Sequence, residues 1–138
     1  MKRCLVLLLL PLLLVATGCS SVLGTGDWDQ VKVTYLSGSD AKQAGDYTLV
    51  VTPKQASYTL DGKESTHELP TGAWQVLTTG VRTLGAHTPK NCLDGASLAI
   101  EASAEGSVKQ SFEATSCDAG DLLNQAKAVA EQVISQLK

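Results

Sequence analysis

The chain has 138 residues, of which 11 are basic and 14 are acidic, giving a formal net charge of −3. That length supports one modest hydrophobic core, so a single folded domain is expected. The few, scattered basic residues exclude the clustered phosphate-binding surface that nucleic acids require.

Residues 1–18 have the anatomy of an export signal. Lys2 and Arg3 come first, an almost uninterrupted apolar run follows from position 4 to 16, and small residues then precede a cysteine. The ending Ala16-Thr17-Gly18-Cys19 resembles the lipobox of bacterial lipoprotein precursors. The alternative is a transmembrane anchor, but the apolar run of about thirteen residues is shorter than the roughly twenty that a span needs.

The lipobox resemblance implies that residues 1–18 are a cleaved signal peptide. Ala16, Thr17 and Gly18 would be recognised by the signal peptidase, and Cys19 would carry the lipid that anchors the protein. Residues 19–27 would be the lipidated N-terminus and a tether, in which positions 20–26 span at most roughly 25 Å. Ser20 stands where lipoproteins kept at the inner membrane often have Asp, so the resemblance implies an outer-membrane anchor with residues 28–138 forming a periplasmic domain.

From Trp28 the apolar residues alternate, which predicts a strand through Tyr35. A second alternating pair of segments, 47–51 and 56–60, surrounds a turn at Pro53-Lys54. This turn would place Val51 opposite Ala56 and Tyr47 opposite Leu60, with both apolar sets on one face. Asp61-Gly62 predicts a tight turn into a polar edge strand at 63–68.

Between positions 69 and 85 the apolar spacing changes to three and four, which predicts a helix with Thr71 as N-cap and Gly85 at its end. A hairpin is expected next, with Ala104-Glu105-Gly106 as a three-residue loop that sets Leu98 opposite Phe112 and Ala102 opposite Val108. The last segment, from Leu122 to Leu137, predicts an amphipathic helix capped by Asp118 or Asp121.

Four cysteines divide by context. Cys4 leaves with the leader and Cys19 is the lipidation site, so Cys92 and Cys117 remain to form a disulfide in an oxidising compartment. A metal site would need more ligands at short spacing. The predicted fold class is therefore α+β: a small antiparallel sheet of about five or six strands, packed by a middle helix and a C-terminal amphipathic helix, with one disulfide.

No catalytic or cofactor motif is present, so no cofactor or small-molecule substrate is expected. His67 and His87 could meet a serine and a carboxylate, such as Ser37, Ser39 and Asp40, only through the fold. We interpret the serines and Asp40 as loop formers and both histidines as surface residues. Asp27 and Asp29 flank Trp28, which suits sugar binding, but we expect Trp28 to be buried at the start of the first strand. For Trp74 we expect core packing.

Two surfaces could bind a protein partner. The edge strand 63–68 could accept another strand, or its charges could prevent such pairing. A groove between the middle helix and the sheet could accept a partner helix.

The segment from Ala44 to Val50, the helix before Cys92 and the hairpin closing at Cys117 resemble AspS-type pilotins of type II secretion. That resemblance covers residues 44–117 and implies a non-enzymatic outer-membrane lipoprotein that binds or assembles an envelope protein. The alternatives are an inhibitor or immunity lipoprotein acting on a periplasmic hydrolase or toxin, and a hydrolase built around one of the histidines.

Overall fold

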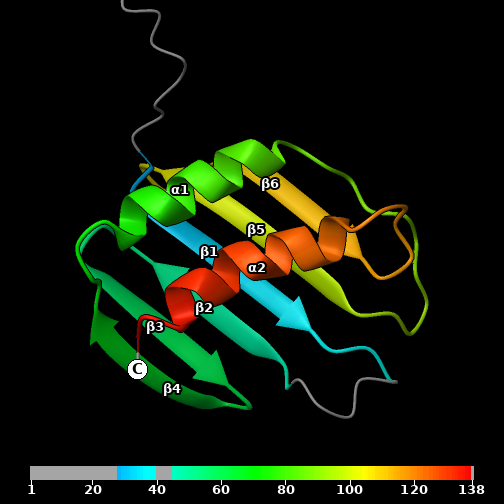
Figure 1. Cartoon of the computed structure of the whole chain (residues 1–138), viewed down its shortest axis with the longest axis horizontal. Coiled ribbons are helices and arrows are strands. Elements are labelled where there is room, and N and C mark those ends of the chain that lie inside the picture. Colours follow the sequence, from blue (N-terminus) through cyan, green and yellow to red (C-terminus); the bar gives the residue numbers. More distant parts are fainter. Residues whose placement is uncertain (1–27, 40–44, 138) are drawn as a thin grey trace, which may run out of the picture.

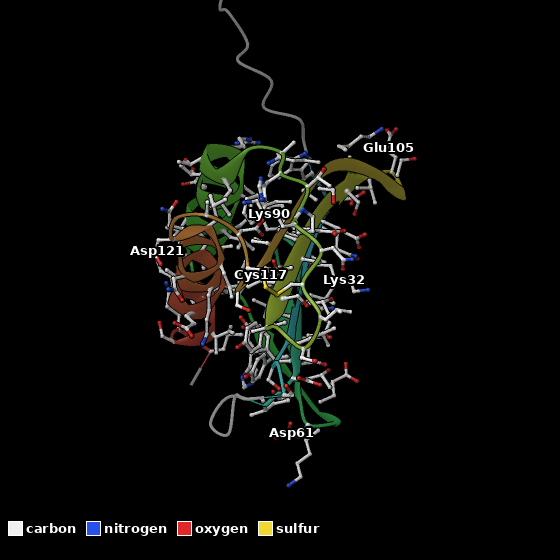
Figure 2. All side chains as sticks on the ribbon, turned by 90° about the vertical axis from the view of Figure 1, so that its right-hand side faces the viewer. Lys32, Asp61, Lys90, Glu105, Cys117 and Asp121 are labelled. Atoms are coloured by element: carbon white, nitrogen blue, oxygen red, sulfur yellow. A yellow bond between two sulfur atoms is a disulfide. The ribbon has the colours of Figure 1, made fainter. Side chains whose placement is uncertain are left out.

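A computed structural model describes residues 28–39 and 45–137. In it, two helices cover one face of a six-stranded antiparallel sheet whose strand order is β4-β3-β2-β1-β5-β6 (Figure 1). Figure 2 shows the sheet nearly edge-on, with both helices on one side and Lys32 pointing away on the other. This α+β architecture and its disulfide confirm the fold class predicted from the sequence.

The centre of the sheet is β1 (Gln30–Leu36), which pairs with β2 (Tyr47–Val51) on one side and β5 (Ser97–Ala104) on the other. The inward residues of β1 are Val31, Val33 and Tyr35, none more than 5% exposed. Trp28, two residues before β1, is also buried, as its position in the sequence predicted.

The β2–β3 hairpin follows the expected register, because β3 (Gln55–Leu60) places Ala56 opposite Val51 and Leu60 opposite Tyr47. Asp61 and Gly62 then have φ of 48° and 78°, the positive values that a two-residue type I′ turn requires. That turn leads into β4 (Lys63–Glu68), which is the edge strand that the sequence predicted.

The middle helix, α1 (Ala73–Leu84), ends at Gly85 as expected, but Thr71 is not its N-cap. Gly72 occupies that position, with φ 85° and ψ −17°, and the Ala73 N–H donates to the carbonyl of Pro70 at 3.0 Å. Those angles belong to the third residue of a type II turn. The turn closes through the backbone, so the Thr71 hydroxyl is not needed as a cap.

The β5–β6 hairpin departs from the expected register by two residues. Glu105 and Gly106 both have positive φ, so the turn has two residues, and Ala104 pairs with Ser107 at the start of β6 (Ser107–Thr115). A bulge then lies between Ser103 and Ala102, and beyond it Ile100 faces Phe112. The two-residue turn alone shifts the pairing by one residue, which would turn Phe112 outward. The bulge shifts it by one more residue, and this second shift returns Phe112 to the core.

The C-terminal helix, α2 (Leu122–Ile134), has Asp121 at its N-cap position, and Asp118 lies outside the helix. Figure 1 shows α1 above the β5–β6 half of the sheet and α2 beside it, running toward β2. Partly buried Trp74 packs against the core, as expected. The core lies between the sheet and the two helices, and its largest fully buried side chains are Phe112, Leu49, Leu77, Leu98, Ile100, Val31, Val33, Val51, Val81 and Val133.

Candidate functional site

The predicted lipobox, Ala16-Thr17-Gly18-Cys19, lies outside the described residues. The described chain begins at Trp28, whose ring lies 4.8 Å from the guanidinium carbon of Arg82 on α1. Asp29 accepts a hydrogen bond from the Glu105 N–H at 2.7 Å. The carboxylate of Asp29 thus holds the β5–β6 turn. Its suggested partner Asp27 is outside the described residues, as is Asp40.

The predicted disulfide joins Cys92 to Cys117, with Cα atoms 5.7 Å apart. It links the loop after α1 to the end of β6. The same end of the sheet carries the start of β5, because Ser97 pairs with Leu36 and with Thr115. The Asp61-Gly62 turn also lies at this end, opposite Glu105 (Figure 2). We call this the disulfide end of the sheet.

Asp118 organises the loop at the disulfide end. Its carboxylate accepts the backbone N–H of Lys90 at 2.9 Å and that of Thr115 at 2.7 Å, and its side chain is only 3% exposed. The hydrogen bond from Lys90, followed by that from Thr115, lowers the pKa of Asp118 to about 2. These bonds favour the ionised carboxylate. Sequence reasoning assigned Asp118 only a possible helix cap, because its true partners are distant in the chain.

His87 is less exposed than the sequence suggested. Its carbonyl accepts the Glu113 N–H at 3.1 Å, its ring lies 5.7 Å from that of Phe112, and its Nε2 is 3.5 Å from an oxygen of Asp118. The side chain is 30% exposed. His87 therefore fixes the loop to the outer edge of β6, in contact with a buried carboxylate.

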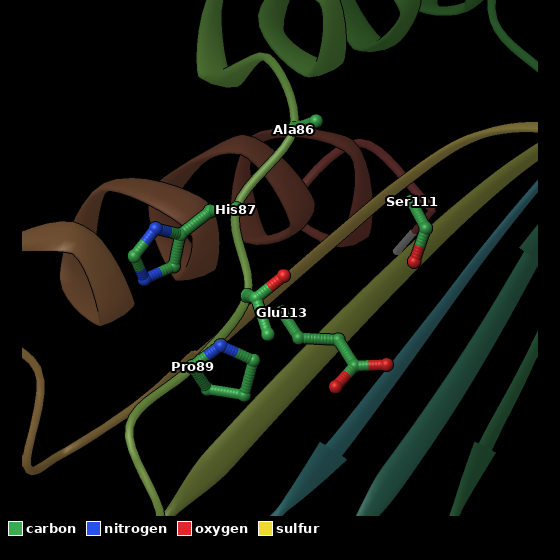
Figure 3. A pocket seen from close by; sticks show the side chains of 6 residues that line it. Ala86, His87, Pro89, Ser111 and Glu113 are labelled. Carbon is green, nitrogen blue, oxygen red and sulfur yellow. The ribbon is translucent and has the colours of Figure 1, made fainter.

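A hollow beside His87 is lined by Ala86, His87, Thr88, Pro89, Ser111 and Glu113 (Figure 3). Within it the imidazole points away from the Ser111 and Glu113 side chains, on the other side of the backbone. Among the described residues, no serine hydroxyl is hydrogen-bonded to His87 or to His67, which is exposed on β4. None of the described serines is therefore in the hydrogen-bonded serine–histidine arrangement that a catalytic triad requires. Ser37 and Ser39 instead donate to Asp46 and to the carbonyl of Asp94.

Leu93 is the most exposed large apolar side chain of the described chain, at 86%. It follows Cys92 of the disulfide and precedes Asp94, whose carbonyl accepts the Ser39 N–H at 3.2 Å. The disulfide of Cys92 and the hydrogen bond to Asp94 thus constrain the backbone on both sides of Leu93. Nearby, Leu36 is 50% exposed and lines a hollow of about 260 Å³ together with Pro89 and Ala99. Sequence reasoning missed this surface because periodicity identifies buried faces, whereas Leu93 lies in a loop.

No described segment covers the sheet face opposite the helices, and this face is largely polar (Figure 2). Small hydroxyl side chains follow one another across neighbouring strands, since Thr34 pairs with Thr48 and Thr48 with Thr59. The other members of this face, in β1, β3, β5 and β6, include Lys32, Ser57, Ala99, Glu101, Ser111 and Glu113. We call it the open face.

The proposed groove between α1 and the sheet is filled. Leu77 and Val81 of α1 are at most 1% exposed, and they belong to the same core as Phe112. On the flank of α1 that faces α2, Gly80 lies so close to α2 that a Cβ there would meet a methyl of Val129 at 2.8 Å. A partner helix could enter between α1 and the sheet only by displacing core residues.

The comparisons with known proteins gave no match: no protein-family model, curated protein or solved structure is similar to this chain. Within the described residues, no helix is both long and apolar enough to cross a membrane. The same residues contain no group of three or more potential metal ligands. The fold and surfaces define a disulfide-containing, two-layer α+β domain with one open sheet face.

Proposed function

We propose that this protein is a non-enzymatic, lipid-anchored binding module of the bacterial envelope, which acts like a pilotin by holding or assembling a protein partner at the outer membrane. The sequence supports the anchor at Cys19 through its lipobox. The observation that carries the binding role is the free edge of β4 beside the open face, which together offer an unpaired strand and a broad polar surface.

The position of the anchor sets the orientation of the domain. Trp28 and the start of β1 lie at the end of the sheet that carries the Glu105 turn, because Asp29 bonds to Glu105. The short tether would hold this end toward the membrane. The disulfide end and Leu93 would then point into the periplasm, and the β4 edge would be accessible from the side.

The test is to isolate the acylated mature protein from its native envelope after in-cell crosslinking. The expected result is one enriched envelope protein, and the Cys19→Ser variant should lose both membrane attachment and that enrichment. Normal processing and membrane attachment of Cys19→Ser would contradict the anchor. Recovery of no envelope protein above the level of an unrelated acylated lipoprotein would contradict the binding role.

An inhibitor of a periplasmic hydrolase or toxin is a second candidate, and Leu93 is the observation that favours it. An exposed apolar side chain on a loop that a disulfide constrains can enter a partner's pocket at a lower entropic cost than one on an unconstrained loop. The test compares Leu93→Asp with Val108→Asp, because Val108 is also exposed, at 55%, but lies near the opposite end of the sheet. Loss of hydrolase inhibition only in Leu93→Asp supports this candidate, and equal behaviour of the two variants contradicts it.

A further inference from the structure

The two edges of the sheet differ in their accessibility. At β6, the loop after α1 runs alongside the strand, with His87 bridging to Phe112 and accepting the N–H of Glu113. At β4 all six residues are exposed, and no described segment pairs with the outer side of the strand. A partner strand can therefore be added to the sheet at β4 more readily than at β6.

The turn at Asp61-Gly62 determines which backbone groups of β4 are free. In a two-residue hairpin the closing pair, here Leu60 with Lys63, exchanges both hydrogen bonds, and the pattern then alternates. Odd-numbered residues therefore bond back to β3, which agrees with the Leu69 N–H donating to the carbonyl of Lys54 at 2.9 Å. The N–H and C=O groups of Glu64, Thr66 and Glu68 point outward.

The side chains of these three residues all lie on the open face, and two of them are carboxylates. The cross-strand neighbour of Glu64 is Thr59 and that of Glu68 is Gln55, both neutral. Between the two carboxylates, Thr66 lies 3.0 Å from the hydroxyl of Ser57. The free edge thus presents two negative charges that no neighbouring strand residue neutralises.

A second copy of the chain is a poor occupant of this edge. Two copies related by a two-fold axis must pair their outward-facing residues with one another in antiparallel order. The register that uses all three residues centres on Thr66, so it sets each Glu64 against Glu68 of the second copy. Like charges directly opposite each other destabilise a sheet, so self-pairing is disfavoured.

We infer that the β4 edge binds an extended segment of a partner protein as an added antiparallel strand, with basic side chains four residues apart opposite Glu64 and Glu68. This inference rests on the proposed binding function and names the chemistry of its partner. The backbone groups of the three outward residues form the hydrogen bonds to the added strand, and the two carboxylates determine which partner sequences bind. A small or β-branched residue of the partner would face Thr66.

The experiment uses the full-length protein and an acetylated, amidated nine-residue peptide of alternating threonine and valine with two lysines four residues apart. The same peptide with glutamates in place of the lysines is the ligand control. We expect the lysine peptide to bind and the glutamate peptide not to bind. Binding should slow hydrogen exchange at the N–H groups of Glu64, Thr66 and Glu68.

The double variant E64K/E68K should bind the lysine peptide about tenfold more weakly or worse, because two favourable pairs become repulsive. It should also gain binding to the glutamate peptide. The matched control is E101K/E113K, which makes the same charge change on the open face away from β4 and should retain wild-type affinity. Equal losses in both variants, or binding without protection of the three N–H groups, would overturn the inference.

Thr66→Pro supplies an independent variant. Its N–H points outward, so proline removes a donor that only an added strand would use, at an edge position that tolerates proline. Peptide binding should be lost while the unfolding midpoint changes little. Unchanged peptide affinity in a folded Thr66→Pro protein would refute strand addition.

Crosslinking of E64K/E68K in the native envelope separates this inference from the proposed function. Loss of the partner that the wild type enriches supports the β4 edge as its binding site. Retention of that partner means that the binding function stands and the β4 inference fails. If the wild type enriches no partner, the proposed function itself fails, whatever the peptides do.

Discussion

The carboxylate of Asp118 accepts the backbone N–H of Lys90 at 2.9 Å, although the two residues are 28 positions apart. This bond, together with the one from Thr115, holds the loop after α1 against the end of β6. The disulfide joins the same two segments. The disulfide end of the domain is therefore held by one covalent link and by one buried carboxylate.

Asp118→Asn tests this carboxylate. The pKa of Asp118 is lowered from 3.8 to about 2, chiefly by the hydrogen bond from Lys90. A carboxylate with a lowered pKa contributes stability that is fully present above its unfolded-state pKa and is lost as the pH falls through the folded-state value. We expect the wild type to lose free energy of unfolding between about pH 4 and about pH 2, and the variant to lose less over that interval, as measured by urea unfolding. Equal slopes against pH in the two proteins would contradict this role.

Gln110 of β6 completes the end of α1. Its Nε2 donates to the carbonyls of Val81 and Gly85 at 2.8 and 2.9 Å. Gln110→Ala should lower the free energy of unfolding by about 1–3 kcal/mol, because two partly buried hydrogen bonds to backbone carbonyls are lost. Gln110→Glu should cost more, because a carboxylate would face two carbonyls at the negative end of the helix dipole. Denaturant unfolding of the three proteins checks the order, and a Gln110→Glu protein as stable as the wild type would contradict it.

Much of the fold could be predicted because every strand of the described sheet except β4 buries one face. The alternation in β1, β2 and β3 fixed their faces, and the turn at Pro53-Lys54 then fixed the register. The β5–β6 register could not be obtained this way. A three-residue loop and a two-residue turn followed by a bulge both place Phe112 inward, so the apolar pattern does not distinguish them.

The candidate surfaces were predictable to different degrees. The edge strand β4 could be found because a wholly polar strand after an Asp-Gly turn has no buried face. The exposure of Leu93 and the hydrogen bonds of Asp118 could not be predicted, since both depend on loops that are brought together across the sheet. The filling of the space between α1 and the sheet by Leu77 and Val81 could not be predicted either, because apolar spacing identifies the face of a helix but not how closely that face packs on the sheet.

Gly80 allows the close approach of α1 to α2. A Cβ at this position would lie 2.8 Å from Cγ1 of Val129, so Gly80→Ala forces a shift between the helices. We expect a net loss of about 1–3 kcal/mol from overpacking, although alanine is the better helix former by about 1 kcal/mol. Thermal unfolding of Gly80→Ala, Val129→Ala and the double variant checks this. The double variant should be more stable than the sum of the single effects predicts, and simple additivity would contradict the contact.

Removal of the disulfide by the double variant Cys92→Ser, Cys117→Ser should lower the free energy of unfolding by about 3 kcal/mol. The two cysteines are 25 positions apart, and without the bond between them the unfolded chain gains conformational entropy. The fold should persist, since the bonds of Asp118 and the pairing of Ser97 with Thr115 hold the same end of the sheet. The measurement is urea unfolding with and without a thiol reductant. Reductant should bring the wild type to the midpoint of the variant and leave the variant unchanged. A wild type whose midpoint does not move would show that this disulfide does not stabilise the domain, and the loop carrying Leu93 would then be held by hydrogen bonds alone.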